Sequence, residues 1–164
     1  MTDNNYDLIV AYILKNQDKF YRLAYTYIKN PDGAMDVVQS AICRALEKHA
    51  LLKDRDAVNT WFYKILVNEC LTYLRRHSKE VLIDEEDWEN HASGIYLEAA
   101  FEPGEDVLSK LDRLSPDVKT VILLYYFEEL TLKEIAEVTQ TNLNTVKSRM
   151  YSGLRKLKMI INKS

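Results

Sequence analysis

The stretch TLKEIAEVTQTNLNTVKSRMYSGLRKLK, residues 131–158, contains two helical patterns separated by a short polar break. Thr131 and Glu134 have the spacing of a capping box, in which each side chain satisfies a backbone N–H at a helix start. The apolar spacing that follows predicts a short helix ending near Thr139. After a tight turn, Asn142 can cap the next helix. The stretch therefore predicts a short helix, a tight turn and a long helix.

The long helix has two different faces. The apolar face consists of Val146, Met150, Leu154, Leu157 and Ile161, at steps of four, four, three and four. The second face consists of Lys147, Ser148, Tyr151, Ser152 and Arg155. Residues 145–158 hold five cations and no acid. A basic, hydroxyl-rich and aromatic face opposite a buried one suits a helix in a DNA major groove. A merely solvated basic helix is the alternative, but the preceding short helix and turn favour a helix-turn-helix.

Residues 115–127 are expected to form the core helix of the same domain. Ser115 is placed as an N-cap, Pro116 as the first helical residue, and Asp117 complements the helix dipole. The sequence VKTVILLYYF, which follows directly, is apolar nearly all round. It is therefore expected to form the core of this domain.

The charge is distributed unevenly along the 164 residues, whose formal net charge is −3. Residues 80–112 carry eleven acids and a single lysine, whereas residues 131–164 carry seven cations and two acids. The part from 80 to 104 shows little periodicity and is interpreted as an acidic, self-repelling flexible linker. With only four Gly and three Pro, a turn-rich β fold is disfavoured. The sequence predicts an all-α protein of two small helical domains joined by this linker.

Enzyme chemistry and membrane insertion have no support in the sequence. Cys43 and Cys70 form no CxxC and are expected to be two buried small hydrophobes. The three histidines are scattered, and no phosphate-binding loop or nucleophile motif is present. We expect no catalytic residue, no cofactor and no metal. The first residues lack the cations of a signal peptide, and no apolar run approaches ~20 residues. We expect a cytoplasmic protein, not itself a membrane protein.

Two helical segments are expected in the N-terminal half. NPDGAMDVVQSAICRALEKH (30–49) has one apolar side, with Asp36, Gln39 and Ser40 on the opposite side. NTWFYKILVNECLTYLRRHSK (59–79) ends in a basic cluster. Its expected buried stripe is Trp61, Ile65, Leu66, Cys70 (or its neighbour Leu71) and Leu74.

These segments together resemble a bacterial RNA polymerase sigma factor of the extracytoplasmic-function (ECF) group, within the sigma-70 superfamily. Residues 115–158 resemble region 4, residues 30–49 resemble region 2.2, and residues 59–79 resemble regions 2.3 and 2.4. Gln140 and Glu129 stand where the family often has glycine. If both need a left-handed backbone, each side chain costs about 1 kcal/mol, and local strain is expected there.

The resemblance implies an alternative sigma factor that binds core RNA polymerase and directs promoter-specific transcription initiation. The implied domains are 1–79 (region 2), the linker 80–104, and 105–164 (region 4). The implied partners are promoter DNA and the polymerase β′ clamp helices and β flap. Family members are also usually held inactive by an anti-sigma factor, often membrane-bound. A stand-alone helix-turn-helix transcriptional regulator is the alternative, but it leaves the match over residues 59–79 unexplained.

The resemblance also assigns site residues. Those implied for the −35 element are Asn144, Thr145, Lys147, Ser148, Arg149, Tyr151, Ser152 and Arg155. Those implied for the −10 element are Trp61, Lys64, Asn68, Tyr73, Arg75, Arg76 and Lys79. Those implied for docking on core polymerase are Asp36, Val37, Gln39 and Ser40, the last standing where the family usually has glutamate.

Asn68 matches the family position that helps hold a base flipped out of the non-template strand. Such capture relies on hydrogen bonds to the base edge in a fitted pocket. A plain surface amide is the alternative for Asn68. For Trp61 and Tyr73, a place in the core is favoured over base stacking.

Overall fold

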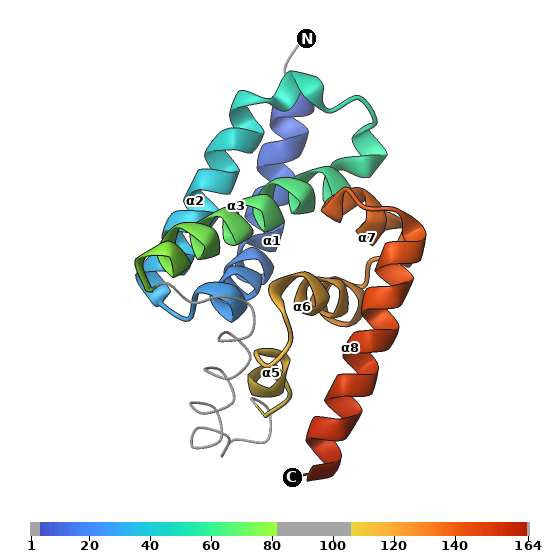
Figure 1. The fold of residues 1–164 in the computed structure, drawn as a ribbon. Coiled ribbons are helices and arrows are strands. Elements are labelled where there is room, and N and C mark those ends of the chain that lie inside the picture. The colour runs from blue at the N-terminus through green and yellow to red at the C-terminus, as the bar shows by residue number, and fades with distance from the viewer. Residues whose placement is uncertain (1–3, 82–105, 164) are drawn as a thin grey trace. The chain divides into compact units, whose positions relative to one another are not determined.

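The computed structural model describes residues 4–81 and 106–163, which contain helices and turns but no β-strand. They divide into two compact units, one made mainly of residues up to His77 and the other mainly of those after it. The first unit contains α1 (Asn4–Ile28), α2 (Pro31–Glu47), the 3₁₀ turns η1 (His49–Leu51) and η2 (Arg55–Ala57), and α3 (Val58–Val81). The second contains α5 (Asp106–Leu111), α6 (Pro116–Ile122), the π-helical turn η3 (Leu123–Phe127), α7 (Leu132–Thr139) and α8 (Leu143–Lys163). The all-α, two-domain prediction is confirmed (Figure 1).

The expected linker, residues 80–104, lies outside the described residues apart from Glu80 and Val81, which continue α3. The described part of the chain contains no helix that is both long enough and apolar enough to cross a membrane.

A tight turn joins α1 to α2 in the first unit. Lys29 adopts a left-handed backbone with φ of 63°. Asn30 caps α2, because its side-chain oxygen accepts a hydrogen bond from the Gly33 N–H at 3.0 Å. Pro31 opens the helix, where its missing N–H does no harm. The turn therefore folds α2 back along α1.

Aromatic rings from α1 and α3 form the centre of the first unit. Phe20 on α1 lies with its ring centroid 4.4 Å from that of Phe62 and 5.7 Å from that of Tyr63. The residues of α3 that are fully buried are Phe62, Tyr63, Leu66, Val67 and Cys70. The predicted stripe was therefore correct for Leu66 and Cys70 but wrong for Trp61, Ile65 and Leu74, which are only half-buried. Because every residue of the run WFYKILV except Lys64 is apolar or aromatic, periodicity alone could not select the buried face.

The helix-turn-helix of the second unit forms as predicted. Thr131 and Glu134 make both bonds of the capping box, at 2.8 and 3.1 Å. The Asn142 side chain accepts the Thr145 N–H at 2.8 Å and caps α8. Glu129 and Gln140 have φ values of 59° and 56°, so the expected left-handed backbone is confirmed at both positions. Ser115 occupies the N-cap of α6, but its side chain makes no capping bond.

Close helix packing holds α8 against α6. Gly153 faces α6, and a Cβ placed on it would lie only 2.5 Å from Ile122 Cδ1 and 2.7 Å from Val118 Cγ1. The glycine therefore lets the two helix axes approach closely.

The run VKTVILLYYF (118–127), expected to form the core, is buried only in part. Val121 to Leu124 are buried as predicted, but Tyr125, Tyr126 and Phe127 are 40–52% exposed. The exposure of these three aromatic side chains has a local cause. The chain forms a π-helical turn over η3, which changes the side-chain spacing from that of the α-helix.

A buried ion pair links the turn after α5 to α6. The Lys119 ammonium donates to the Asp112 carboxylate, and both side chains are 5% exposed. Neither residue had a signal in the sequence, because an apolar environment for this pair arises only once α5 and α6 are packed. Cys43 also departs from expectation: it is exposed on α2, whereas Cys70 is buried.

Replacing Gln140 by glycine is expected to stabilise the second unit by about 0.5–1 kcal/mol, because relief of the left-handed strain exceeds the added chain entropy. Urea unfolding followed by circular dichroism measures the change. Gln140→Ala is the matched control and should give no gain, since alanine retains its Cβ. An equal gain from alanine would show that backbone strain is not the cause.

Replacing Lys119 by alanine is expected to lower the unfolding free energy of the second unit by about 3 kcal/mol, because the Asp112 charge stays buried without its partner. The same urea experiment measures the loss. The double variant Asp112→Leu, Lys119→Met leaves no buried charge and should recover much of that stability. A double variant as unstable as the single one would contradict this role for the pair.

Candidate nucleic-acid interfaces

The turn between α7 and α8 determines how α8 is presented. Gln140 reverses the chain direction through its left-handed backbone, and the Thr141 N–H donates to the Ala136 carbonyl at 3.0 Å. Asn142 then starts α8, and its side chain accepts a hydrogen bond from the Thr145 N–H in the first turn. The geometry is that of a helix-turn-helix whose second helix is long and faces outward on one side.

The two faces of α8 are close to the predicted ones. The inner face consists of Val146, Met150, Gly153 and Leu157, all buried. Ile161, expected on that face, is 50% exposed, and Leu154 is half-buried. The predicted −35 residues that are exposed are Asn144, Lys147, Ser148, Tyr151, Ser152 and Arg155; Thr145 and Arg149 are half-buried. The outer face thus combines cations, hydroxyl groups and one exposed tyrosine.

Arg149 also interacts within its own domain. Its Nη2 lies 3.7 Å from the Asp117 carboxylate at the start of α6. Asp117 is more exposed than Arg149, at 59% against 26% for the side chains. Arg149 therefore faces the edge of the outer surface, with part of its charge already compensated.

A second polar face runs along α3. Trp61, Lys64, Asn68 and Arg75 recur at steps of three, four and seven, which places them on one side of the helix. Asn68 and Arg75 are exposed, and Arg75 donates to the Thr72 hydroxyl at 3.2 Å. These four predicted −10 residues are therefore brought together.

Of the other three predicted −10 residues, Tyr73 and Arg76 do not join that face. Tyr73 points toward α2, since a Cβ on Gly33 would lie 2.7 Å from its hydroxyl, and it stacks on His77 at 3.8 Å. Arg76 is exposed, but it lies about 80° around the helix from Asn68 and about 100° from Arg75. Lys79 lies in α3, and its side chain is outside the described residues.

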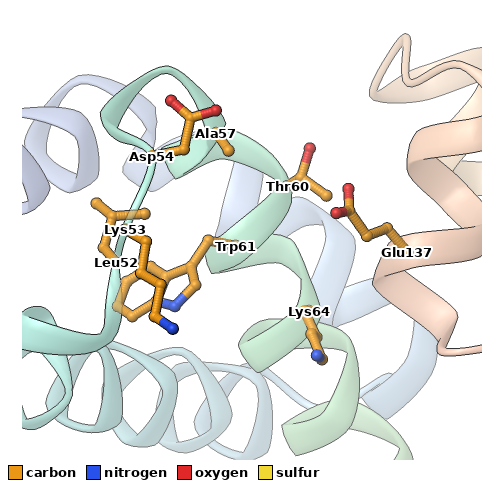
Figure 2. Close-up of a pocket in the computed structure, with 8 residues that line it drawn as sticks. All are labelled: Leu52, Lys53, Asp54, Ala57, Thr60, Trp61, Lys64 and Glu137. Atoms are coloured by element: carbon orange, nitrogen blue, oxygen red, sulfur yellow. The ribbon is translucent and has the colours of Figure 1, made fainter.

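The segment before α3 supplies site residues that sequence reasoning missed. A hollow beside Trp61 is lined by Leu52, Lys53, Asp54, Ala57, Thr60 and Lys64. Figure 2 shows the Trp61 indole next to Leu52 and Lys53, with Lys64 about one turn further along α3. Nothing in the spacing of LLKDRDA (51–57) indicates that it folds back on Trp61, because it follows neither helical nor strand periodicity.

The exposed face of α2 carries three of the four residues implied for docking on core polymerase. Asp36, Gln39 and Ser40 are exposed together, as predicted. Val37 is 4% exposed and packs in the core, so it cannot belong to this face. Helix geometry explains why Val37 is buried while Asp36 is exposed, since Val37 lies about 100° around the helix from Asp36.

A helix-turn-helix with a basic outer face, beside a second helical unit with its own polar face, defines a two-domain DNA-binding protein. Family models match both units: "Sigma-70 region 2" over residues 12–80 and "Sigma-70, region 4" over residues 104–157. The chain belongs to the sigma-70 family of RNA polymerase sigma factors, in its ECF group.

Two relatives show how far the similarity extends. The RNA polymerase sigma factor SigV of Bacillus subtilis is 38% identical over 156 residues, covering 95% of this chain and 92% of that protein. The ECF RNA polymerase sigma-E factor of Haemophilus influenzae is 32% identical over 171 residues, covering 96% and 86%. Similarity to both therefore spans nearly the whole length.

A solved structure shares the fold. The sigma factor RpoE of Bartonella quintana, solved in complex with the anti-sigma factor NepR, matches with a TM-score of 0.73. The match covers 93% of this chain and 95% of that one, at 19% sequence identity.

Replacing Lys147 by alanine is expected to weaken binding to duplex DNA about three- to tenfold and to reduce the salt slope of log K by about 0.9. The physical reason is the loss of one phosphate contact and its released counterion. Fluorescence anisotropy at several salt concentrations, on duplexes selected from a random library, measures both quantities. Lys158→Ala removes an exposed charge about three turns further along α8 and should change both much less. Equal losses would contradict a reading surface on the first turns of α8.

Proposed function

We propose that this chain acts as an alternative sigma factor through two DNA-reading surfaces, α8 for the −35 element and the polar face of α3 for the −10 element. The observation that carries the proposal is the family match over both helical units. The proposed division is 1–79 for core docking and the −10 element, 80–104 as linker, and 105–164 for the −35 element. A sigma factor needs both units on one chain, because it must contact two promoter elements and the polymerase together.

At the −35 element, α8 is proposed to lie in the major groove with its outer face toward the bases. Lys147 and Arg155 can reach guanine edges or phosphates, and Ser148 and Ser152 can donate to either. Tyr151, 64% exposed and apolar along its ring, can contact thymine methyl groups. Arg149 is proposed to contact phosphate, since Asp117 draws it toward the edge of the surface.

At the −10 element, the proposed ligand is a single base flipped out of the non-template strand. The Asn68 amide can pair with a base edge, and the hollow beside Trp61 offers an aromatic wall and two lysines, Lys53 and Lys64. Arg75 and Arg76 are proposed to contact phosphates, which position the strand without reading it. The half-buried Trp61 can serve both the fold and the base.

Docking on core polymerase is proposed for the exposed face of α2. Asp36, Gln39 and Ser40 present carboxylate, amide and hydroxyl groups toward the β′ clamp helices. Val37 contributes from inside, by packing α2 in the core. A second contact, between the region 4 domain and the β flap, is proposed from the family resemblance.

An anti-sigma factor is the proposed regulator. Support comes from the similar fold of the sigma factor RpoE, which was solved in complex with one. Such a partner would act by covering the polymerase-docking surfaces. The chain itself is proposed to be a non-catalytic cytoplasmic protein, because bacterial polymerase and chromosomal DNA are located there.

The rival function is a stand-alone helix-turn-helix regulator that binds an operator without polymerase. The second unit alone fits both functions. The rival gives no account of why residues 12–80 match sigma region 2. It also assigns no role to the hollow beside Trp61.

Run-off transcription with purified bacterial core polymerase tests the proposal. On the DNA upstream of the protein's own gene, initiation should require the chain. Asn68→Ala is expected to reduce promoter opening about tenfold, since a base contact is worth about 1–3 kcal/mol. The surface amide variant Gln17→Ala, on α1, is the matched control and should initiate normally.

The outcomes separate the two functions. Specific duplex binding with no core-dependent initiation would favour the regulator. Core-dependent initiation that is unaffected by Asn68→Ala would retain the sigma function but remove Asn68 from base capture.

A further inference from the structure

The segment that faces Trp61 has little internal support. Between α2 and α3 it forms only the short turns η1 and η2, whose backbone bonds include Leu51 N–H to Lys48 O at 2.8 Å, Leu52 N–H to His49 O at 3.2 Å and Ala57 N–H to Asp54 O at 2.9 Å. Such 3₁₀ turns are weakly held compared with α-helix. Yet Leu52, Lys53 and Asp54 from this segment line the hollow. Its position must therefore be determined by other contacts.

The first turns of α1 supply those contacts. The Asn5 side-chain amide donates to the carbonyl oxygens of His49 at 3.2 Å and Leu52 at 2.8 Å. An amide NH₂ carries two hydrogens, so one side chain can satisfy both carbonyls. These bonds span η1 from end to end. Asn5 thus fixes the chain directly before Lys53 and Asp54.

Two further residues of α1 act on the same segment. The Tyr12 hydroxyl donates to the Asn59 side-chain oxygen in the first turn of α3. The ring of Tyr6 meets His49 edge-on, with centroids 5.4 Å apart. Asn5 and Tyr12 are seven residues apart and so lie on one face of α1. Together they hold the segment on both sides of the hollow.

We propose that Asn5 and Tyr12 are positioning residues for base capture at the −10 element, acting through the segment 49–59. This inference rests on the proposed function, because it takes the hollow beside Trp61 as the base site. A pocket discriminates between bases only when its walls are held in place before the base arrives, since a loose wall lets the wrong base fit. Loss of either contact should therefore reduce discrimination between bases at the −10 element more than it affects core binding or recognition of the −35 element.

The test compares promoter opening on templates that carry each of the four bases at each −10 position. Permanganate reactivity of core polymerase with the full-length chain gives the opening. At the position where the wild type discriminates most strongly, Asn5→Ala should lower the ratio of best to worst base about three- to tenfold. Tyr12→Phe, which removes only a hydroxyl, should act in the same direction.

Asn16→Ala is the matched control. Asn16 is also a partly buried amide on α1, but it donates within α1, to the Tyr12 carbonyl at 2.9 Å. It should leave base discrimination unchanged. Competition with a reference sigma factor for core, and discrimination at the −35 element, should change less than twofold in all three variants.

The outcomes are distinct. Unchanged discrimination in both Asn5→Ala and Tyr12→Phe overturns the positioning role while the sigma function stands. Equal loss at the −10 and −35 elements also overturns it, because that result indicates general destabilisation. If the wild type opens no promoter with core, the proposed function itself fails.

Discussion

Burial of one face of α8 against α6 is the constraint on which the second unit depends. The unit is small, so its recognition helix must also supply part of its core. Val146 and Met150 serve that core, and Gly153 allows the close approach to Val118 and Ile122. Because the inner face is fixed in this way, the side chains about half a turn away are directed outward. The surface that we propose for reading DNA is thus a consequence of the packing.

The first unit uses α3 in the same manner. Phe62 and Tyr63 pack on Phe20, and this burial turns Asn68 and Arg75 to the outside. The base site that we propose beside Trp61 needs a second wall, which comes from the irregular segment 49–59. Irregular segments hold position poorly by themselves, so α1 fixes this one through the amide of Asn5.

Local signals made the second unit largely predictable from sequence. The capping box of Thr131 and Glu134 and the cap of Asn142 act within four residues, and each formed as expected. The left-handed backbones at Glu129 and Gln140 were also expected, because the resemblance placed glycine there.

What sequence could not predict depends on contacts between distant residues or on local helix distortion. The segment 49–59 is held near Trp61 by hydrogen bonds to α1 that join residues 44 to 47 positions apart in the chain. The pair Asp112 and Lys119 becomes buried only in the packed unit. Exposure of Tyr125 follows from a π-helical turn that has no recognised sequence signal.

Footprinting of the chain with core polymerase on its promoter tests the central claim, that one chain reads two elements with two separate surfaces. The account predicts two protected elements about two helical turns apart. Lys147→Ala should weaken protection of the upstream element, and Asn68→Ala should reduce strand opening at the downstream one. A single protected element that forms without polymerase, and that Asn68→Ala leaves unchanged, would contradict the account.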